Sequence, residues 1–395
     1  MHDATLDPMT LLPTDTAAPL SEAEVAGWRE RFPILSRRTY LANHTLGAMP
    51  ASVADSLAAF AQQWATQGVD AWPDWFAEAR RVADLLGGLL GAPAGSVVVH
   101  QNVAALAEMV LSALPRDPRR NRVVLADDEW PGHHYLLAEH DRLGLEPVVV
   151  PASDSVDALL AAVDDRTALV ICSHVRFRDA RILDLAAVVA AAHGHGALVL
   201  GDGYHAAGVL ALDVDALGVD AYVGGSVKWL CGGPGAGWLY VRPGSAPALR
   251  PGFVGWLGHA RPFAFAPAWE AGEGAFGWLG GTPGMPALFA AREGYRILTE
   301  VTPERVRATS QVLTAALVEG ALERGLRVRT PVDPAQRGAS VTLDAGDDTP
   351  AAARRLADRG FAVDARPGAG IRVGAHFFNT LEECRRVLEV LAPRP

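Results

Sequence analysis

The chain has 395 residues, half of them hydrophobic, and a formal net charge of −10 at pH 7. This length suits a large domain with a smaller one, and the acidic balance disfavours nucleic acid or an anionic membrane as a partner. No apolar run reaches the ~18 residues of a membrane span, no signal peptide is recognisable, and the three cysteines lack CxxC spacing. We therefore expect a cytoplasmic protein without a disulfide framework or a metal site.

The first residues predict a loose arm and one short helix. Residues 1–20 lack apolar periodicity, and Ser21 before two glutamates is a suitable helix N-cap. Apolar spacing then predicts the elements that lead into the main domain, which are a strand at 39–41, a glycine-containing loop at 42–50, a helix at 51–66 and a helix ending near Gly91.

Strands and helices alternate through the middle of the chain. The predicted strands are 96–99, 122–126, 147–150, 168–172, 197–200, 221–223 and 237–241. This spacing predicts a mostly parallel sheet with helices on both faces, in which ligands bind at the carboxyl ends of the strands. Several side chains lie just beyond those ends, namely Asn102, Trp130, His174, Asp202, His205 and Lys228.

Two of these side chains indicate a cofactor. Asp202 ends one apolar strand, and Lys228 follows the next strand after a run of small residues. Pyridoxal 5'-phosphate (PLP) needs a carboxylate to keep its pyridine nitrogen protonated and a lysine amine to hold its aldehyde as a Schiff base. Either residue alone would be an ordinary turn aspartate or a solvated lysine, but the pair in this apolar, glycine-flanked context favours PLP. The strand-to-helix junction at Asn102 would suit the phosphate.

The regular alternation of strands and helices ends after about residue 242. Residues 251–286 are rich in glycine and aromatic residues and predict ordered loops near the site. The remaining predicted elements suggest a small α+β domain, with helices at 285–300, 305–324, 350–359 and 380–392 and strands at 327–329, 339–343, 362–364 and 371–373. We divide the chain into an arm with a short helix (1–35), a large PLP-binding domain (36–260), and loops with a small domain (261–395).

Several segments resemble the fold-type I PLP enzymes of the class V aminotransferase group, and kynureninase most of all. The similar segments are YLANHTLGAMP from Tyr40, GDGYHAAG from Gly201, SVKWLCGGPGAG from Ser226, GWLGH from Gly255, GGTPGMPAL from Gly280 and IRVGAHFFNTLEE from Ile371. The resemblance implies an α/β fold, with a mostly parallel seven-stranded sheet in the large domain. It also implies a homodimer whose sites lie at the subunit interface.

The resemblance also assigns roles to matched residues. Lys228, Asp202 and His205 are expected to be catalytic, and Arg372 is expected to bind the substrate α-carboxylate as a bidentate fork. The expected cofactor-binding residues are Lys228, Asp202, His205, Trp130, Asn102, Val103, Ala104, Ser226, Trp256 and Thr282, with Trp130 stacking on the ring and Thr282 reaching the phosphate across the dimer. His44 and His133 are expected beside the substrate.

The chain departs from the kynureninase pattern at several of these positions. Val227 stands where the family has a tyrosine that contributes to phosphate binding and proton transfer, and Val103 and Ala104 replace hydroxyl residues. His133 and His44 replace an aspartate and an asparagine. Fold and cofactor are compatible with these changes, but the sequence leaves open whether kynurenine itself is cleaved.

Three kinds of function therefore stay open. The first is kynureninase-type cleavage, in which Lys228 takes the Cα proton of a small amino-acid substrate and the Cβ–Cγ bond breaks to give alanine and an anthranilate. The second is another class V reaction that begins with the same proton removal, such as C–S lysis by β-elimination, epimerisation or transamination. The third is a degenerate protein that binds PLP weakly and has no activity.

Overall fold

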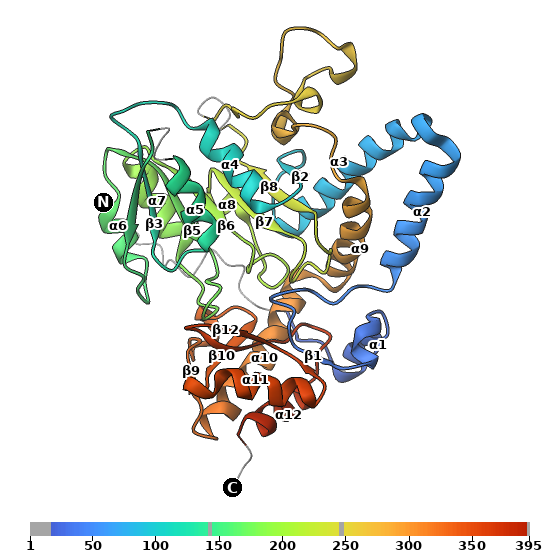
Figure 1. The fold of residues 1–395 in the computed structure, drawn as a ribbon, viewed down its shortest axis with the longest axis vertical. Coiled ribbons are helices and arrows are strands. Elements are labelled where there is room, and N and C mark those ends of the chain that lie inside the picture. Colours follow the sequence, from blue (N-terminus) through green and yellow to red (C-terminus); the bar gives the residue numbers. More distant parts are fainter. Residues whose placement is uncertain (1–16, 141–143, 245–248, 393–395) are drawn as a thin grey trace.

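The computed structural model describes residues 17–140, 144–244 and 249–392. Its centre is a seven-stranded sheet with the strand order β2-β8-β7-β6-β5-β3-β4 (Figure 1). Strand β8 runs antiparallel to both of its neighbours, β2 and β7, and the other pairs of adjacent strands in this sheet are parallel. The strands are β2 (Val97–His100), β3 (Arg122–Ala126), β4 (Glu146–Val150), β5 (Thr167–Ser173), β6 (Leu198–Asp202), β7 (Ala221–Gly225) and β8 (Gly237–Val241). The predicted mostly parallel sheet of seven strands is confirmed.

Central strands that are apolar on both sides explain the layering. Every residue of β5, β7 and β8 is buried, as expected for strands covered on both faces. One face packs against α4 (Val103–Ala113) and α5 (Pro131–His140). The opposite face is covered by α3 (Trp72–Leu90), α6 (Asp157–Ala162), α7 (Leu185–Gly194) and α9 (Met285–Val301), and α2 (Ser52–Gln67) packs on the outside of α9. The short helix α8 (Val214–Leu217) joins β6 to β7.

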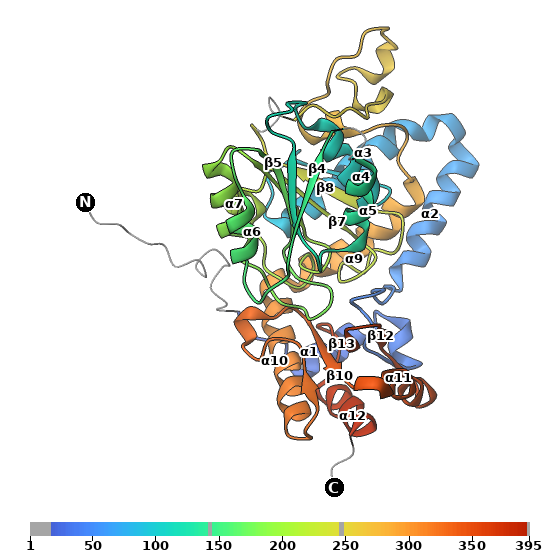
Figure 2. The ribbon, with the colours of Figure 1, turned by 60° about the vertical axis from the view of Figure 1, so that its left-hand side comes forward.

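The small domain has its own antiparallel sheet, in the order β12-β13-β10-β9. Figure 2 shows this sheet below the large one, with helices packed against it. Its core is a separate apolar cluster. The elements are α10 (Pro303–Leu322), β9 (Arg327–Val328), β10 (Ser340–Asp344), α11 (Thr349–Asp358), β12 (Asp364–Arg366), β13 (Gly370–Gly374) and α12 (Leu381–Leu391).

The N-terminal segment is attached to the small domain. The helix α1 (Glu22–Arg29) begins at Ser21, as predicted, and its Arg29 forms two 3.0 Å bonds to the Glu383 carboxylate in α12. The strand β1 (Thr39–Tyr40) then pairs in parallel with β11 (Phe361–Ala362). The single strand predicted at 362–364 is therefore wrong, because β11 pairs with β1 whereas β12 joins the four-stranded sheet.

The predicted domain limits stay a prediction, but the packing bears on two of them. Strand β1 pairs outside the large sheet although it lies within 36–260, and α9 packs on α2 and α3 although it lies within 261–395. The region predicted as loops holds short 3-10 helices, including η5 (Trp256–Gly258), η6 (Pro262–Ala264) and η7 (Gly274–Trp278), and part of it projects from the top of the molecule (Figure 1). No helix within the described ranges is long and apolar enough to cross a membrane.

Candidate active site

A cavity of about 350 Å³ lies where the carboxyl edge of the large sheet meets the small domain. Its walls come from five strand-end loops of the large domain, from the loop after β1, and from the small-domain strands β12 and β13. Among the described residues it is lined by His44, Thr45, Asn102, Val103, Ala104, Trp130, Ser173, Val175, Phe177, Asp202, Tyr204, His205, Lys228, Arg366 and Arg372. The cavity thus gathers most of the side chains that the sequence singles out.

Lys228 contributes a buried amine to this cavity. Its Nζ lies 2.8 Å from His205 Nε2 and 5.7 Å from the centre of the Trp130 ring. Burial, with a further contribution from the Arg372 charge, lowers the pKa of Lys228 to about 7, although Asp202 opposes the shift. Burial and the Lys228 charge hold the pKa of His205 well below its usual value. The imidazole is therefore neutral, and its Nε2 can accept a hydrogen bond from the lysine amine.

Asp202 is held from two sides. Its Oδ1 accepts the backbone N–H of Tyr204 at 2.8 Å, and its Oδ2 lies 2.9 Å from Nε2 of the buried His133. Burial disfavours the charged imidazole, but the hydrogen bond and charge of Asp202, together with Glu129, outweigh it and raise the pKa of His133. The predicted place of His133 beside the substrate is therefore not observed, because the imidazole is paired with Asp202 and does not line the cavity.

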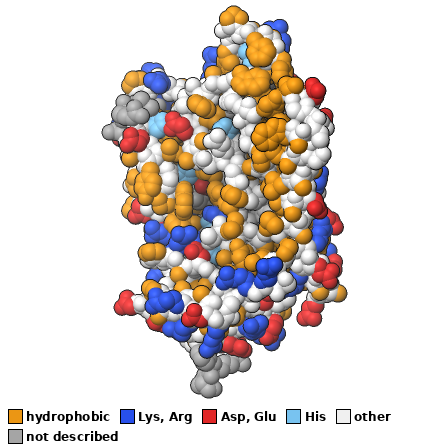
Figure 3. All heavy atoms as spheres, turned by 45° about the vertical axis from the view of Figure 1, so that its right-hand side comes forward, with side chains coloured by type: hydrophobic (Ala, Val, Ile, Leu, Met, Phe, Trp, Pro, Cys, Tyr) orange, Lys and Arg blue, Asp and Glu red, His pale blue; other side chains and the backbone are white. Residues whose placement is uncertain are grey.

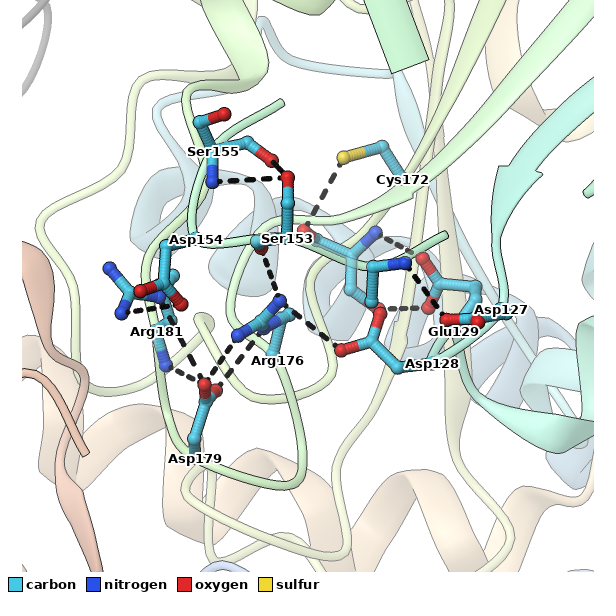
Figure 4. Close-up of polar contacts among 12 residues, drawn as sticks. Asp127, Asp128, Glu129, Ser153, Asp154, Ser155, Cys172, Arg176, Asp179 and Arg181 are labelled. Atoms are coloured by element: carbon cyan, nitrogen blue, oxygen red, sulfur yellow. Dashed lines mark hydrogen bonds and ion pairs between the residues drawn. The ribbon is translucent and has the colours of Figure 1, made fainter. Parts of the chain in front are cut away.

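Glu129 closes this network on the side of β5. Its Oε2 accepts the backbone N–H of Ser173 at 2.7 Å, and its Oε1 accepts the Ser173 hydroxyl and the Trp130 N–H. Figure 4 shows the Glu129 carboxylate directed at the end of β5. The ligand atoms of Glu129, His133 and Asp202 lie within 4.8 Å of one another, and these hydrogen bonds account for their closeness. No metal role is assigned to them.

An ion-pair network fixes the loop after β5. Arg176 pairs with Asp128 at 3.2 Å and with Asp179, and it donates to the Ser153 carbonyl at 2.8 Å (Figure 4). This loop carries Phe177, whose ring meets Trp130 edge-on with centres 5.4 Å apart. The network therefore sets one wall of the cavity without contacting its interior.

Arg372 enters the cavity from β13. Its Nη1 donates to the Phe177 carbonyl at 2.7 Å, and its Nε donates to Asp364 Oδ2 at 2.9 Å, with Nη2 directed at the same oxygen. Asp364 and Arg372 are register partners on β12 and β13. Arg366 also donates to Asp364, at 3.0 Å, and lines the cavity. The predicted carboxylate fork is thus held by an aspartate of the adjacent strand.

His44 is buried beside this arginine pair. It is fully enclosed, and burial lowers its pKa to about 4. Its Nε2 lies 3.7 Å from Asp364 Oδ2, and neither ring nitrogen has a hydrogen-bond partner among the described residues. A buried imidazole without a partner is costly, so the position of His44 is set by the packing around it and not by a hydrogen bond.

The start of α4 forms the opposite end of the cavity. Asn102 caps the helix by accepting the Ala105 N–H at 3.0 Å. The other N–H groups of the first turn have no intrahelical partner, because no turn precedes them. Val103 and Ala104 contribute no hydroxyl there. A helix N-terminus of this kind attracts a phosphate through its N–H groups and its dipole.

Three predicted cofactor residues do not line the cavity of the single chain. The Ser226 hydroxyl is fully buried, donates to the Ala236 carbonyl at 2.6 Å and contacts the Tyr295 hydroxyl. Trp256 packs among projecting aromatic rings, including Phe76 and Phe263, and Thr282 is exposed. Their predicted contacts with the phosphate stay predictions.

The sequence reasoning missed three residues that line the cavity, Tyr204, Arg366 and Phe177, and it missed Asp364, which holds Arg372. Tyr204 had a recognisable signal, because it lies just beyond a predicted strand, between Asp202 and His205. Phe177 contributes a backbone carbonyl and an edge contact, for which no sequence signal exists.

The donor set fits PLP. An amine of lowered pKa, a buried carboxylate, an exposed aromatic face and a helix N-terminus line one cavity, and they match the aldehyde, the pyridine nitrogen, the ring and the phosphate, respectively. Without a bound group, Lys228 would be a buried amine that lacks a paired carboxylate. The residues that would hold the cofactor are therefore Lys228, Asp202, Trp130 and the first residues of α4.

Comparison with known proteins gives a consistent result. Residues 40–387 match the family Aminotransferase class-V. The chain is 28% identical to a kynureninase of Pseudomonas fluorescens, over 98% of this chain and 94% of the relative. It is 33% identical to a kynureninase of Deinococcus radiodurans, over 84% and 85%.

Similar solved structures share the fold at lower identity. A cysteine desulfurase of Thermococcus onnurineus NA1 superposes with a TM-score of 0.83 at 18% identity, covering 95% of this chain and 98% of the other. A complex between the cystine C-S lyase C-DES and cysteine persulfide superposes with a TM-score of 0.84 at 22% identity, covering 91% and 98%.

Proposed function

Because the chain belongs to the class V aminotransferase family of PLP-dependent enzymes, we propose that it cleaves the side chain of an L-amino acid at the β-carbon, as kynureninases do. The substrate would be kynurenine or an amino acid of similar shape. Water would add to its γ-carbonyl before the Cβ–Cγ bond breaks, so that the products are alanine and an anthranilate. The observation that carries this proposal is the joint placement of Lys228, Asp202 and Arg372 around one cavity in a chain that is similar to kynureninases along most of its length.

Each residue has a defined task in this reaction. Arg372 binds the substrate α-carboxylate, held in position by Asp364 and the Phe177 carbonyl. Lys228, with a pKa of about 7, takes the Cα proton, and the neutral His205 beside it orients the amine through a hydrogen bond. Bound PLP supplies the electron sink for the bonds broken at Cα and Cβ. Asp202, paired with His133, supplies the negative charge opposite the pyridine nitrogen.

A second candidate is β-elimination from the same carbanion, such as cleavage of a C–S bond. The observation that favours it is Val227, which has no hydroxyl for proton transfer where kynureninases have a tyrosine. A β-substituent can leave as a thiolate with little acid assistance, since a thiolate is a stable leaving group, whereas kynurenine cleavage leaves a carbanion at Cβ that must be protonated to give alanine.

Product analysis separates the two candidates. The holoenzyme would be incubated with L-kynurenine, 3-hydroxykynurenine and an S-alkylcysteine, and anthranilate, alanine and pyruvate would be measured. The first proposal predicts equal amounts of an anthranilate and alanine from a kynurenine. Pyruvate from the thioether without any anthranilate would overturn it in favour of β-elimination.

We also propose that the protein works as a homodimer. The projecting segment around η5 and η6 exposes large apolar side chains, namely Phe253, Trp256, Phe263, Phe265 and Trp269. Figure 3 shows apolar side chains gathered on this projection at the top of the view. An exposed aromatic cluster of this kind marks an interaction surface, and a second copy would bring Trp256 and Thr282 toward a phosphate site.

A further inference from the structure

Tyr204 lies in the cavity beside Lys228. Its backbone N–H is fixed to Asp202 Oδ1 at 2.8 Å, and its ring centre is 4.1 Å from Lys228 Nζ. The same Nζ is 5.7 Å from the Trp130 ring, so the lysine amine lies close to both aromatic faces. Tyr204 is only partly buried and lines the cavity. Its side chain is therefore within reach of whatever Lys228 holds.

The Tyr204 hydroxyl lies over the end of β7, on the face of the sheet that also carries the start of α4. A Cβ on Gly225 would come within 2.5 Å of Tyr204 Oη, so the phenol lies over the end of β7 only because that residue is glycine. Gly225 is the register partner of Gly237 on β8, and paired residues of adjacent strands face the same side of a sheet. A Cβ on Gly237 would lie 2.8 Å from the Cα of Asn102.

The Tyr204 phenol and the start of α4 therefore lie on the same face of the sheet, over the paired residues Gly225 and Gly237. The packing agrees, because Tyr204 contacts the apolar cluster to which the α4 side chains belong. Asn102, Val103, Ala104 and Tyr204 line the same cavity. A side chain at either glycine would fill the space between the hydroxyl and the helix.

Tyr204 Oη is a free hydrogen-bond donor. Among the described residues it has no hydrogen-bond partner, and it is not one of the sealed polar atoms of the interior. Burial, with a smaller contribution from the Asp202 charge, raises the pKa of Tyr204 to about 12. The hydroxyl therefore keeps its proton at physiological pH.

A phosphate at the start of α4 needs such a donor. The helix supplies backbone N–H groups, but Val103, Ala104 and Val227 offer no hydroxyl. Lys228 is committed to the aldehyde, and Arg372 is held by Asp364 and the Phe177 carbonyl. We propose that the Tyr204 hydroxyl donates a hydrogen bond to the phosphate of PLP at the N-terminus of α4, in place of the hydroxyls absent from positions 103, 104 and 227. This inference depends on cofactor binding and not on which reaction follows.

Removing the hydroxyl alone tests the proposal. Cofactor-free Tyr204→Phe, prepared from the purified holoenzyme, would be titrated with PLP and, separately, with pyridoxal, which has the aldehyde and ring but no phosphate. Losing a hydrogen bond to a charged group should raise the dissociation constant of PLP roughly tenfold to a hundredfold. The dissociation constant of pyridoxal should not change. Tyr135→Phe, which removes the hydroxyl of an exposed tyrosine, should match wild type for both ligands.

The remaining outcomes are decisive as well. Unchanged PLP affinity in Tyr204→Phe, or an equal loss for PLP and pyridoxal, would overturn the phosphate contact. In the second case the phenol would act on the ring or on Lys228. Normal pyridoxal binding by Tyr204→Phe shows that the variant has folded, and a changed ³¹P chemical shift of its bound PLP would support the direct contact. A holoenzyme that binds PLP but makes no anthranilate would overturn the proposed reaction and leave this inference intact.

Discussion

At the scale of single residues, burial decides which ionisable groups can react. The amine of Lys228 is enclosed near two arginines, which brings its pKa to about 7. The neighbouring His205 and His44 are held neutral, chiefly by burial as well. The cavity therefore contains a lysine that is largely a free amine just above neutrality, which an exposed lysine is not.

The pH dependence of cofactor capture follows from this pKa. Only the neutral amine attacks the PLP aldehyde, so the rate of PLP addition to the cofactor-free protein should rise about tenfold per pH unit below 7 and level off above it. Stopped-flow absorbance between pH 5.5 and 9, at a fixed low PLP concentration, measures this rate. A rate that still rises steeply from pH 8 to 9 would mean that Lys228 titrates like an exposed lysine. Lys228→Ala, as the control, should show no covalent phase.

His133 should make stability depend on pH. Its pKa is raised by the Asp202 and Glu129 carboxylates against the effect of burial, so its stabilising charge is fully present below the unfolded-state pKa of about 6.5 and is lost as pH rises through the folded-state pKa. Replacing His133 by Asn should lower the free energy of unfolding by about 3 kcal/mol at pH 6 and by less at pH 9. Urea unfolding of the holoenzyme at both pH values tests this, and a difference that does not vary with pH would contradict a charged His133.

At the scale of elements, the loop after β1 is fixed against the turn that carries Lys228. The Gly47 N–H donates to the Val227 carbonyl at 2.7 Å. A Cβ on Gly47 would lie 2.0 Å from the Lys228 carbonyl oxygen. The backbone on both sides of this contact therefore leaves no space for a side chain, and the loop that carries His44 is positioned by the lysine turn.

Gly47→Ala should consequently destabilise the protein by about 1–3 kcal/mol and weaken PLP retention, because the loop must move away from Lys228. Thermal unfolding and cofactor content after dialysis measure the two effects. Gly27→Ala is the matched control, since Gly27 is exposed in α1 with nothing within 4 Å of the added Cβ. It should raise stability by up to about 1 kcal/mol through helix propensity. Equal behaviour of the two variants would show that the Gly47 contact is not tight.

Much of the element pattern is readable from the sequence. The strands at 122–126 and 237–241 are predicted at their observed bounds, because each is a short apolar run between clear breaks. The break between β11 and β12 is not readable, because it depends on two different partner strands. Helix α7 begins at Leu185, because the Asp184 side chain accepts the Ala187 N–H as its cap.

The site is predictable where it depends on the parallel sheet. Asp202, Trp130 and Lys228 come together because strand ends meet at one edge. The pairing of His133 with Asp202 and the hold of Asp364 on Arg372 are contacts between distant side chains. Strand and helix periodicity carries no information about such pairs.

At the scale of the whole molecule, the projecting aromatic segment should control assembly. Phe263 and Phe265 are 62% and 77% exposed, and replacing both by Ser should convert a dimer to a monomer, because the buried area of two aromatic anchors would be lost. Sedimentation velocity measures the change. Tyr135→Ser, which alters an equally exposed aromatic side chain elsewhere, should leave the dimer intact. A wild-type protein that sediments as a monomer at micromolar concentration would contradict the proposed assembly.

The pairing of β1 with β11 has a consequence for how the protein is made. Thr39 and Tyr40 leave the ribosome long before their partners Phe361 and Ala362. The residues of the cavity are equally far apart in the sequence, because it needs both His44 and Arg372. The central sheet can form during synthesis, whereas the substrate end of the site must wait until the small domain has been synthesised. Covalent capture of the cofactor would then stabilise the folded protein by mass action, including the pairing of β1 with β11.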